Sequence, residues 1–196
     1  FGLGSGLRYK LTEAITNKDY SLGKALVSTS YISLACIMLI VAGCLIPAVH
    51  FFDWRDILNC NGLSSSYLSI CIIVVLATLL IQFVLELITI VLQANQRAAI
   101  STIFKPISNV VAVIGVLVLK YTTTPSLLAA CLMLTIPLVL VLFIANIALF
   151  LRKYRMIAPS FKYYRTSVIK DIYSLGVKFF ITSLSGVVVY NSTSII

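Results

Sequence analysis

The stretch from Leu68 to Leu92 constrains the fold most, because nearly all of its residues are Leu, Ile, Val, Ala or Phe. A helix rises about 1.5 Å per residue, so this stretch is long enough to cross a bilayer core of roughly 30 Å. Glu86 lies inside it, where an ionised side chain costs on the order of 2.5–3.5 kcal/mol on insertion scales. We therefore expect Glu86 to face protein or a water-filled cavity.

Five polar residues fall on one face of this predicted helix. They recur every three or four residues, within an arc of roughly 80°: Thr78, Gln82, Glu86, Thr89 and Gln93. Such a stripe either lines a path through a membrane protein or joins two helices by hydrogen bonds. Both interpretations are open for the threonines, whereas the cost of burying a charge favours a functional role for Glu86.

The composition indicates a membrane protein with several spans. Of the 196 residues, 60% are hydrophobic and 11% are charged, whereas about 25% of the residues in a soluble domain are charged. The apolar runs predict an all-α, polytopic transmembrane helix bundle with five spans: 27–49, 68–92, 100–119, 127–151 and 172–196. Because the chain starts without Met and stops inside an apolar run, we interpret it as a fragment.

The distribution of basic residues predicts the orientation of the chain. The formal net charge is +9, with four Lys and Arg residues in segment 1–25, six in segment 152–171 and one in each of the shorter connections. By the positive-inside rule both rich segments are cytoplasmic. Basic residues interleaved with tyrosines also occur on nucleic-acid-binding surfaces. A position between spans favours anionic membrane lipids instead, so we expect no nucleic-acid partner.

The remaining motifs have structural interpretations. The glycines of segment 1–6 lack the strand and the Lys-Ser/Thr of a nucleotide loop, which favours close helix packing or a flexible helix end. Leu7, Leu11 and Ile15 recur every four residues and predict a short amphipathic helix at the membrane interface. Neither a Cys/His cluster nor a catalytic cluster is present, so we expect no metal, no cofactor and no enzymatic activity.

Two segments resemble one transporter family. Residues 1–14 and 24–29 resemble the loop after the second helix of Wzx-type polysaccharide flippases, and residues 174–181 resemble the start of their seventh helix. These flippases belong to the multidrug/oligosaccharidyl-lipid/polysaccharide exporter superfamily, which has a MATE-like fold. The resemblance implies that the chain covers about helices three to seven. Residues 1–151 would then belong to the N-terminal lobe, 152–171 would join the lobes, and 172–196 would begin the C-terminal lobe.

The resemblance also implies a function. Flippases of this type move a polysaccharide repeat unit, such as O-antigen, on undecaprenyl diphosphate across the bacterial inner membrane. The expected partners are membrane lipids, the lipid-linked oligosaccharide and other polysaccharide assembly proteins. We therefore expect a multi-pass protein of the inner membrane that works by alternating access of two lobes around a polar cavity.

Position and chemistry nominate the site residues. The diphosphate would attract cations near the cytoplasmic surface: Arg97, Lys105 and Lys178. The sugar hydroxyls would bind amides: Gln82, Gln93, Asn109 and Asn146. Glu86 is the candidate for coupling to H⁺ or Na⁺, because a carboxylate in a dry site changes charge as the cavity hydrates.

Other functions remain alternatives. The first is an ion-coupled multidrug exporter of the same fold, in which Glu86 would meet a cationic drug. A membrane-bound polysaccharide biosynthesis enzyme is disfavoured. Such an enzyme needs a cluster of catalytic residues, often on a sizeable external loop, and the sequence shows no such cluster. A channel or a purely structural membrane subunit is also compatible with the sequence.

Overall fold

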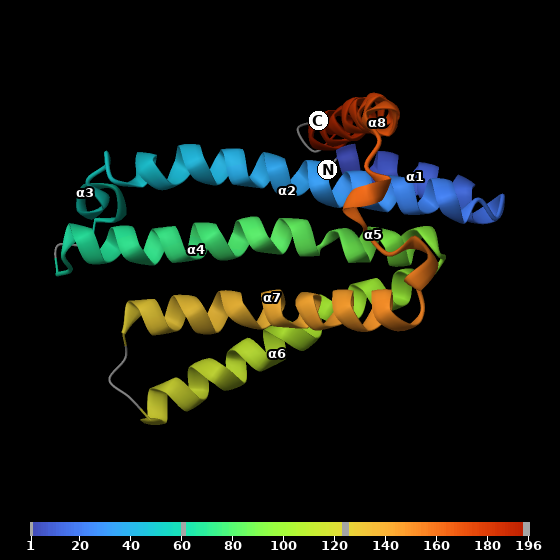
Figure 1. Ribbon diagram of the computed structural model, residues 1–196. Coiled ribbons are helices and arrows are strands. Elements are labelled where there is room, and N and C mark those ends of the chain that lie inside the picture. The colour runs from blue at the N-terminus through green and yellow to red at the C-terminus, as the bar shows by residue number, and fades with distance from the viewer. Residues whose placement is uncertain (1, 60–61, 123–125, 194–196) are drawn as a thin grey trace. The chain divides into compact units, whose positions relative to one another are not determined.

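The computed structural model describes residues 2–59, 62–122 and 126–193, and every regular element in those ranges is a helix (Figure 1). In chain order the α-helices are α1 (Gly2–Thr16), α2 (Tyr20–Val49), α3 (Trp54–Leu58), α4 (Ser65–Leu85), α5 (Leu87–Ala94), α6 (Ala98–Thr122), α7 (Leu127–Arg152) and α8 (Thr166–Thr193). Two 3₁₀ turns, η1 (Arg155–Ile157) and η2 (Phe161–Tyr163), lie between α7 and α8. The predicted all-α fold is confirmed.

Within the described residues, four helical segments are long and apolar enough to cross a membrane: Tyr20–Val49, Ser65–Ala94, Ala98–Tyr121 and Leu127–Arg152. They correspond to the first four predicted spans. Only 6–17% of their most apolar windows is buried, so the described chain leaves most of their apolar surface uncovered. Such surface is typical of helices that face lipid or further protein. The protein is therefore a membrane-embedded, multi-pass protein.

The last helix differs from its prediction. Helix α8 begins at Thr166 rather than at residue 172, so the predicted loop 152–171 is too long, and η1 and η2 occupy part of it. Lys170, Asp171 and Lys178 lie on α8, and α8 is not among the four candidate spans. The fifth span therefore stays a prediction.

The chain forms two compact units, each built from segments that are far apart in sequence. Unit 1 comprises residues 1–33, 87–101 and 149–196, and unit 2 comprises residues 34–86 and 102–148. Unit 1 contains α1, α5 and α8, and unit 2 contains α3 and α4. These units describe packing within the chain, whereas the division into transporter lobes stays a prediction.

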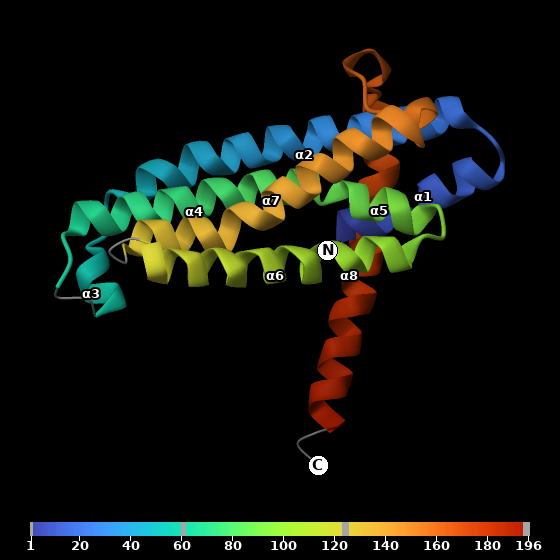
Figure 2. The same cartoon turned by 90° about the horizontal axis from the view of Figure 1, so that it is seen from below.

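In unit 1, helix α1 packs on α8 and α5. Figures 1 and 2 show α8 crossing α1 rather than running along it. At the crossing a Cβ on Gly6 would collide with the carbonyl oxygen of Ile172 and lie 3.0 Å from the backbone nitrogen of Gly176. Close helix packing, predicted for this glycine-rich segment, is thereby confirmed at Gly6.

The apolar face of α1 is used inside the protein. Leu7 and Leu11 are both 0% exposed, which confirms the predicted amphipathic helix. Protein covers these two leucines, so they do not face lipid directly, and the interfacial position of α1 stays a prediction. The covering contacts are tertiary, since α1 packs on α5 and α8 and Leu11 lies close to Gly23 of α2.

Buried hydroxyl groups of α2 hold the segment between α7 and α8. The Ser28 hydroxyl accepts a hydrogen bond from the Ser160 backbone N–H at 2.9 Å, and the Thr29 hydroxyl accepts one from the Arg165 N–H at 3.1 Å. Both side chains are 0% exposed. A buried hydroxyl group without a hydrogen-bond partner is costly. These two bonds therefore give the buried hydroxyl groups of α2 their partners and also fix the segment between α7 and α8 against α2.

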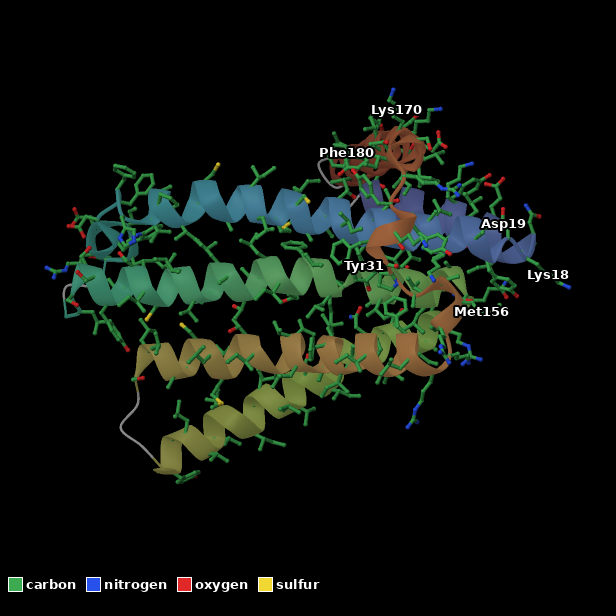
Figure 3. The ribbon with its side chains drawn as sticks, in the orientation of Figure 1. Lys18, Asp19, Tyr31, Met156, Lys170 and Phe180 are labelled. Atoms are coloured by element: carbon green, nitrogen blue, oxygen red, sulfur yellow. The ribbon has the colours of Figure 1, made fainter. Side chains whose placement is uncertain are left out.

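The turn between α1 and α2 has its own local cap. Lys18 has a φ of 56°, in the left-handed region, and the Asp19 carboxylate then accepts from the Leu22 backbone N–H at 3.0 Å and the Ser21 hydroxyl at 3.1 Å. These hydrogen bonds, the Leu22 bond foremost, lower the pKa of Asp19. Figure 3 shows Lys18 and Asp19 at this turn.

Unit 2 is closed at one end by local hydrogen bonds. The Trp54 indole N–H donates to the Val49 carbonyl at 2.7 Å, which ties α3 to the end of α2. Ser64 caps α4, since its hydroxyl accepts from the Tyr67 backbone N–H at 3.2 Å. The Tyr67 hydroxyl in turn accepts from the Leu128 N–H in the first turn of α7 at 3.1 Å.

Candidate functional site

The apolar span Ser65–Ala94 is interrupted at Glu86. Helix α4 ends at Leu85 and α5 begins at Leu87, and the Glu86 backbone N–H donates to the Gln82 carbonyl at 2.8 Å. The sequence predicted one continuous helix over 68–92, so its extent is confirmed and its continuity is wrong. Neither Pro nor Gly lies at this position. The interruption coincides instead with the single charged residue of the span.

Glu86 forms an ion pair with Lys105 of α6. The Lys105 Nζ lies 2.9 Å from Glu86 Oε1. The Glu86 side chain is 29% exposed and that of Lys105 is 63% exposed. Each residue alone would bring an uncompensated charge into an apolar span, whereas the pair is neutral overall. The sequence predicted separate roles for these two residues, and the structure brings them together.

A signal for this pair is present in the sequence. Gln96 lies in the turn between α5 and α6. Glu86 precedes it and Lys105 follows it by nearly equal stretches of chain, about 15 Å and about 14 Å at the rise of a helix. Residues at equal distances from a tight turn lie at the same level of a helical hairpin. Opposite charges at one level of two apolar helices therefore predict an ion pair.

Asn146 of α7 binds the backbone beside the interruption. Its amide nitrogen donates to the Leu85 carbonyl at 3.0 Å and to the Leu142 carbonyl of its own helix at 2.8 Å. The side chain is buried, with 9% exposed. Both amide hydrogens of Asn146 are thus used on backbone carbonyls, and its role as a sugar ligand stays a prediction. Three helices thus supply polar groups around Glu86 within unit 2.

The other predicted site residues are distributed over both units. Gln82 is half-buried on α4 and Asn109 is exposed on α6, both in unit 2. In unit 1 the Gln93 amide nitrogen lies 3.5 Å from the Ser101 hydroxyl, while Arg97 and Lys178 are exposed. Of the eight predicted residues, the structure thus brings Glu86 and Lys105 into direct contact and sets Asn146 on the adjacent carbonyl.

The polar residues of the second span do not all bind a neighbouring helix. The Thr78 hydroxyl lies 2.9 Å from the carbonyls of both Val74 and Val75 in its own helix. Its polarity is therefore satisfied locally, without a second helix. Glu86 and Gln93, in contrast, contact residues of α6.

Unit 1 contains a pocket, lined mostly by residues of polar type, that was not predicted from the sequence. It has a volume of about 720 Å³ and lies among α1, α5, the first residue of α6 and α8. Arg8, Tyr9, Gln93 and Phe179 are among its lining residues. Of these, only Gln93 was a predicted site residue, because the pocket depends on α8 folding back onto α1.

No protein-family profile, curated protein or solved structure matches the chain. No family is therefore assigned by comparison.

Proposed function

We propose that this chain belongs to a membrane flippase that moves a lipid-linked oligosaccharide across the bacterial inner membrane by alternating access. One observation supports this most: an ion pair, Glu86–Lys105, at a helix interruption inside apolar spans. Transporters bind charged cargo at interrupted helices within the membrane. The short segments that resemble Wzx-type flippases supply the substrate class.

In the proposed mechanism Lys105 has two alternative anionic partners. Without substrate its ammonium group is held by Glu86. A diphosphate head group carries more negative charge than one carboxylate and competes for Lys105. Glu86 then becomes an unpaired carboxylate, and binding a proton or Na⁺ restores neutrality. Substrate binding and ion binding are thereby linked through one lysine.

The same pairing favours the flippase over a multidrug exporter. An exporter of cationic drugs needs a carboxylate whose charge is available to the drug. Here a lysine compensates Glu86 at 2.9 Å, so the site is not acidic overall. A cationic drug would have to displace Lys105 before reaching Glu86.

The experiment is complementation of a strain that lacks its own flippase. Glu86→Gln keeps the shape of the side chain and removes the titratable charge, so we expect reduced polysaccharide export at unchanged protein abundance. Asp56→Gln is the control, because Asp56 is exposed in the short helix α3. Full export by Glu86→Gln would contradict ion coupling. Drug extrusion without any effect on lipid-linked oligosaccharide would favour the multidrug exporter.

A further inference from the structure

The pocket of unit 1 has a size and a lining that suit a small-molecule ligand. Its volume of about 720 Å³ lies within the roughly 300–1,000 Å³ typical of small-molecule sites. Six of its lining residues come from α1, which packs on α5 and α8. The pocket is therefore built by tertiary packing rather than by one loop.

The charges of the lining together with that of the adjacent Lys10 favour an anion. Arg8 and Glu13 are its two charged residues. The Glu13 carboxylate is paired with the Lys10 ammonium group at 3.1 Å, and Lys10 lies outside the lining. The Arg8 guanidinium has no ion pair in the part of the chain that the structure describes. A guanidinium offers two parallel N–H donors, which match the oxygens of a phosphate group.

The neutral polar groups of the lining suit hydroxyl groups. The Thr12 hydroxyl lies 2.8 Å from the Arg8 carbonyl and 3.3 Å from the Ala94 carbonyl of α5, and the Thr16 hydroxyl donates to the Thr12 carbonyl at 2.9 Å. With their hydrogens used on backbone carbonyls, both hydroxyl oxygens keep lone pairs that accept hydrogen bonds. Gln93 adds an amide group. Acceptors, an amide and a guanidinium together complement a ligand with several hydroxyl groups.

Two aromatic rings form an apolar part of the wall. The ring centroids of Tyr9 and Phe179 are 6.5 Å apart with an interplanar angle of 49°. Tyr9 is 55% exposed and Phe179 is 37% exposed, so both present ring surface outside the core. Aromatic faces pack on flat apolar surfaces such as the C–H face of a sugar ring.

We propose that this pocket binds a phosphorylated sugar. Arg8 binds the phosphate, Thr12, Thr16 and Gln93 bind sugar hydroxyls, and Tyr9 with Phe179 packs on the sugar ring. The inference stands on the pocket alone and does not need the flippase proposal. The ligand comes either from a soluble sugar phosphate or from the head group of a lipid-linked sugar, because both present the same chemistry.

The test is binding to the purified full chain in nanodiscs of phosphatidylcholine. The probes are N-acetylglucosamine 1-phosphate and undecaprenyl-diphosphate N-acetylglucosamine, with inorganic phosphate and free N-acetylglucosamine as partial ligands. We expect at least one complete probe to bind more tightly than either partial ligand. Binding of the soluble probe alone identifies a soluble sugar phosphate, and binding of the lipid probe alone identifies a lipid head group. Failure of both to exceed the partial ligands overturns the proposal.

Variants separate the pocket from general surface charge. Arg8→Gln should weaken binding by on the order of 10-fold, because it removes a charge-assisted hydrogen bond. Tyr9→Leu should reduce the preference for sugar phosphate over inorganic phosphate and leave phosphate binding unchanged. Arg155→Gln is the matched control, since Arg155 is an exposed arginine of unit 1 outside the pocket. Equal losses in Arg8→Gln and Arg155→Gln would overturn the proposal, provided that ligand-free thermal stability is unchanged.

Discussion

Two ion pairs of similar length lie in very different parts of the molecule. Lys10 and Glu13 are 3.1 Å apart on one face of α1, and Lys105 and Glu86 are 2.9 Å apart between two helices of apolar spans. The first pair joins neighbours on one helix in a polar, basic segment. The second joins residues of different helices where neither charge would be stable alone. The length of a contact therefore does not give its energy; the surrounding medium does.

The largest expected effect comes from breaking the pair in the apolar spans. Lys105→Met leaves the Glu86 carboxylate uncompensated, and we expect a loss of about 2–3 kcal/mol in unfolding free energy. This is less than the roughly 3–5 kcal/mol of a fully buried pair, because both side chains are partly exposed. The measurement is denaturant unfolding of the protein in mild detergent.

The double variant Glu86→Gln with Lys105→Met is the control for that experiment. It removes both charges, so most of the lost stability should return. If the double variant is as unstable as Lys105→Met alone, the lysine contributes through packing and the ion pair is energetically unimportant.

An intermediate effect is expected at Asn146. Asn146→Leu keeps the approximate volume and removes the hydrogen bonds to the Leu85 and Leu142 carbonyls. We expect a loss of about 1–2 kcal/mol in unfolding free energy. Asn109→Leu makes the same chemical change at an exposed position of α6 and should have little effect. Equal losses in both variants would show that the hydrogen bond from Asn146 to the Leu85 carbonyl does not stabilise the fold.

The smallest effect is expected at the pair on α1. Lys10→Met should change the unfolding free energy by less than about 0.5 kcal/mol, since pairs on one helix surface contribute little. Salt screens such a pair, so the difference should disappear at about 1 M salt. A loss that is large and independent of salt would place Lys10–Glu13 in the same class as Glu86–Lys105.

The spans were predictable because bilayer thickness fixes the length of an apolar run. The end of the first span, the extents of the next three and the importance of Glu86 follow from that constraint. The interruption at Glu86 was not predictable, since no Pro or Gly marks it. The pairing of Glu86 with Lys105 was predictable, because both residues lie at nearly equal distances from the turn at Gln96. That prediction requires the positions of charged residues on two neighbouring helices to be compared.

The features that were missed depend on tertiary contacts. Ser28 and Thr29 look like ordinary polar residues at the start of a span, and only the folded segment after α7 gives them partners. The pocket of unit 1 likewise needs Phe179 of α8 beside Tyr9 of α1. No local pattern of period 2 or 3.6 records a contact between the two ends of a chain.

The crossing of α1 and α8 at Gly6 has a consequence for the order of assembly during synthesis. Gly6 approaches Ile172 and Gly176, which are made about 170 residues later. At about 5–20 residues per second, α1 waits roughly 10–30 s on the ribosome before its partner helix exists. Through that interval α1 lacks its packing against α8. Helix α1 therefore gains its contacts with α8 only after most of the described chain has been made.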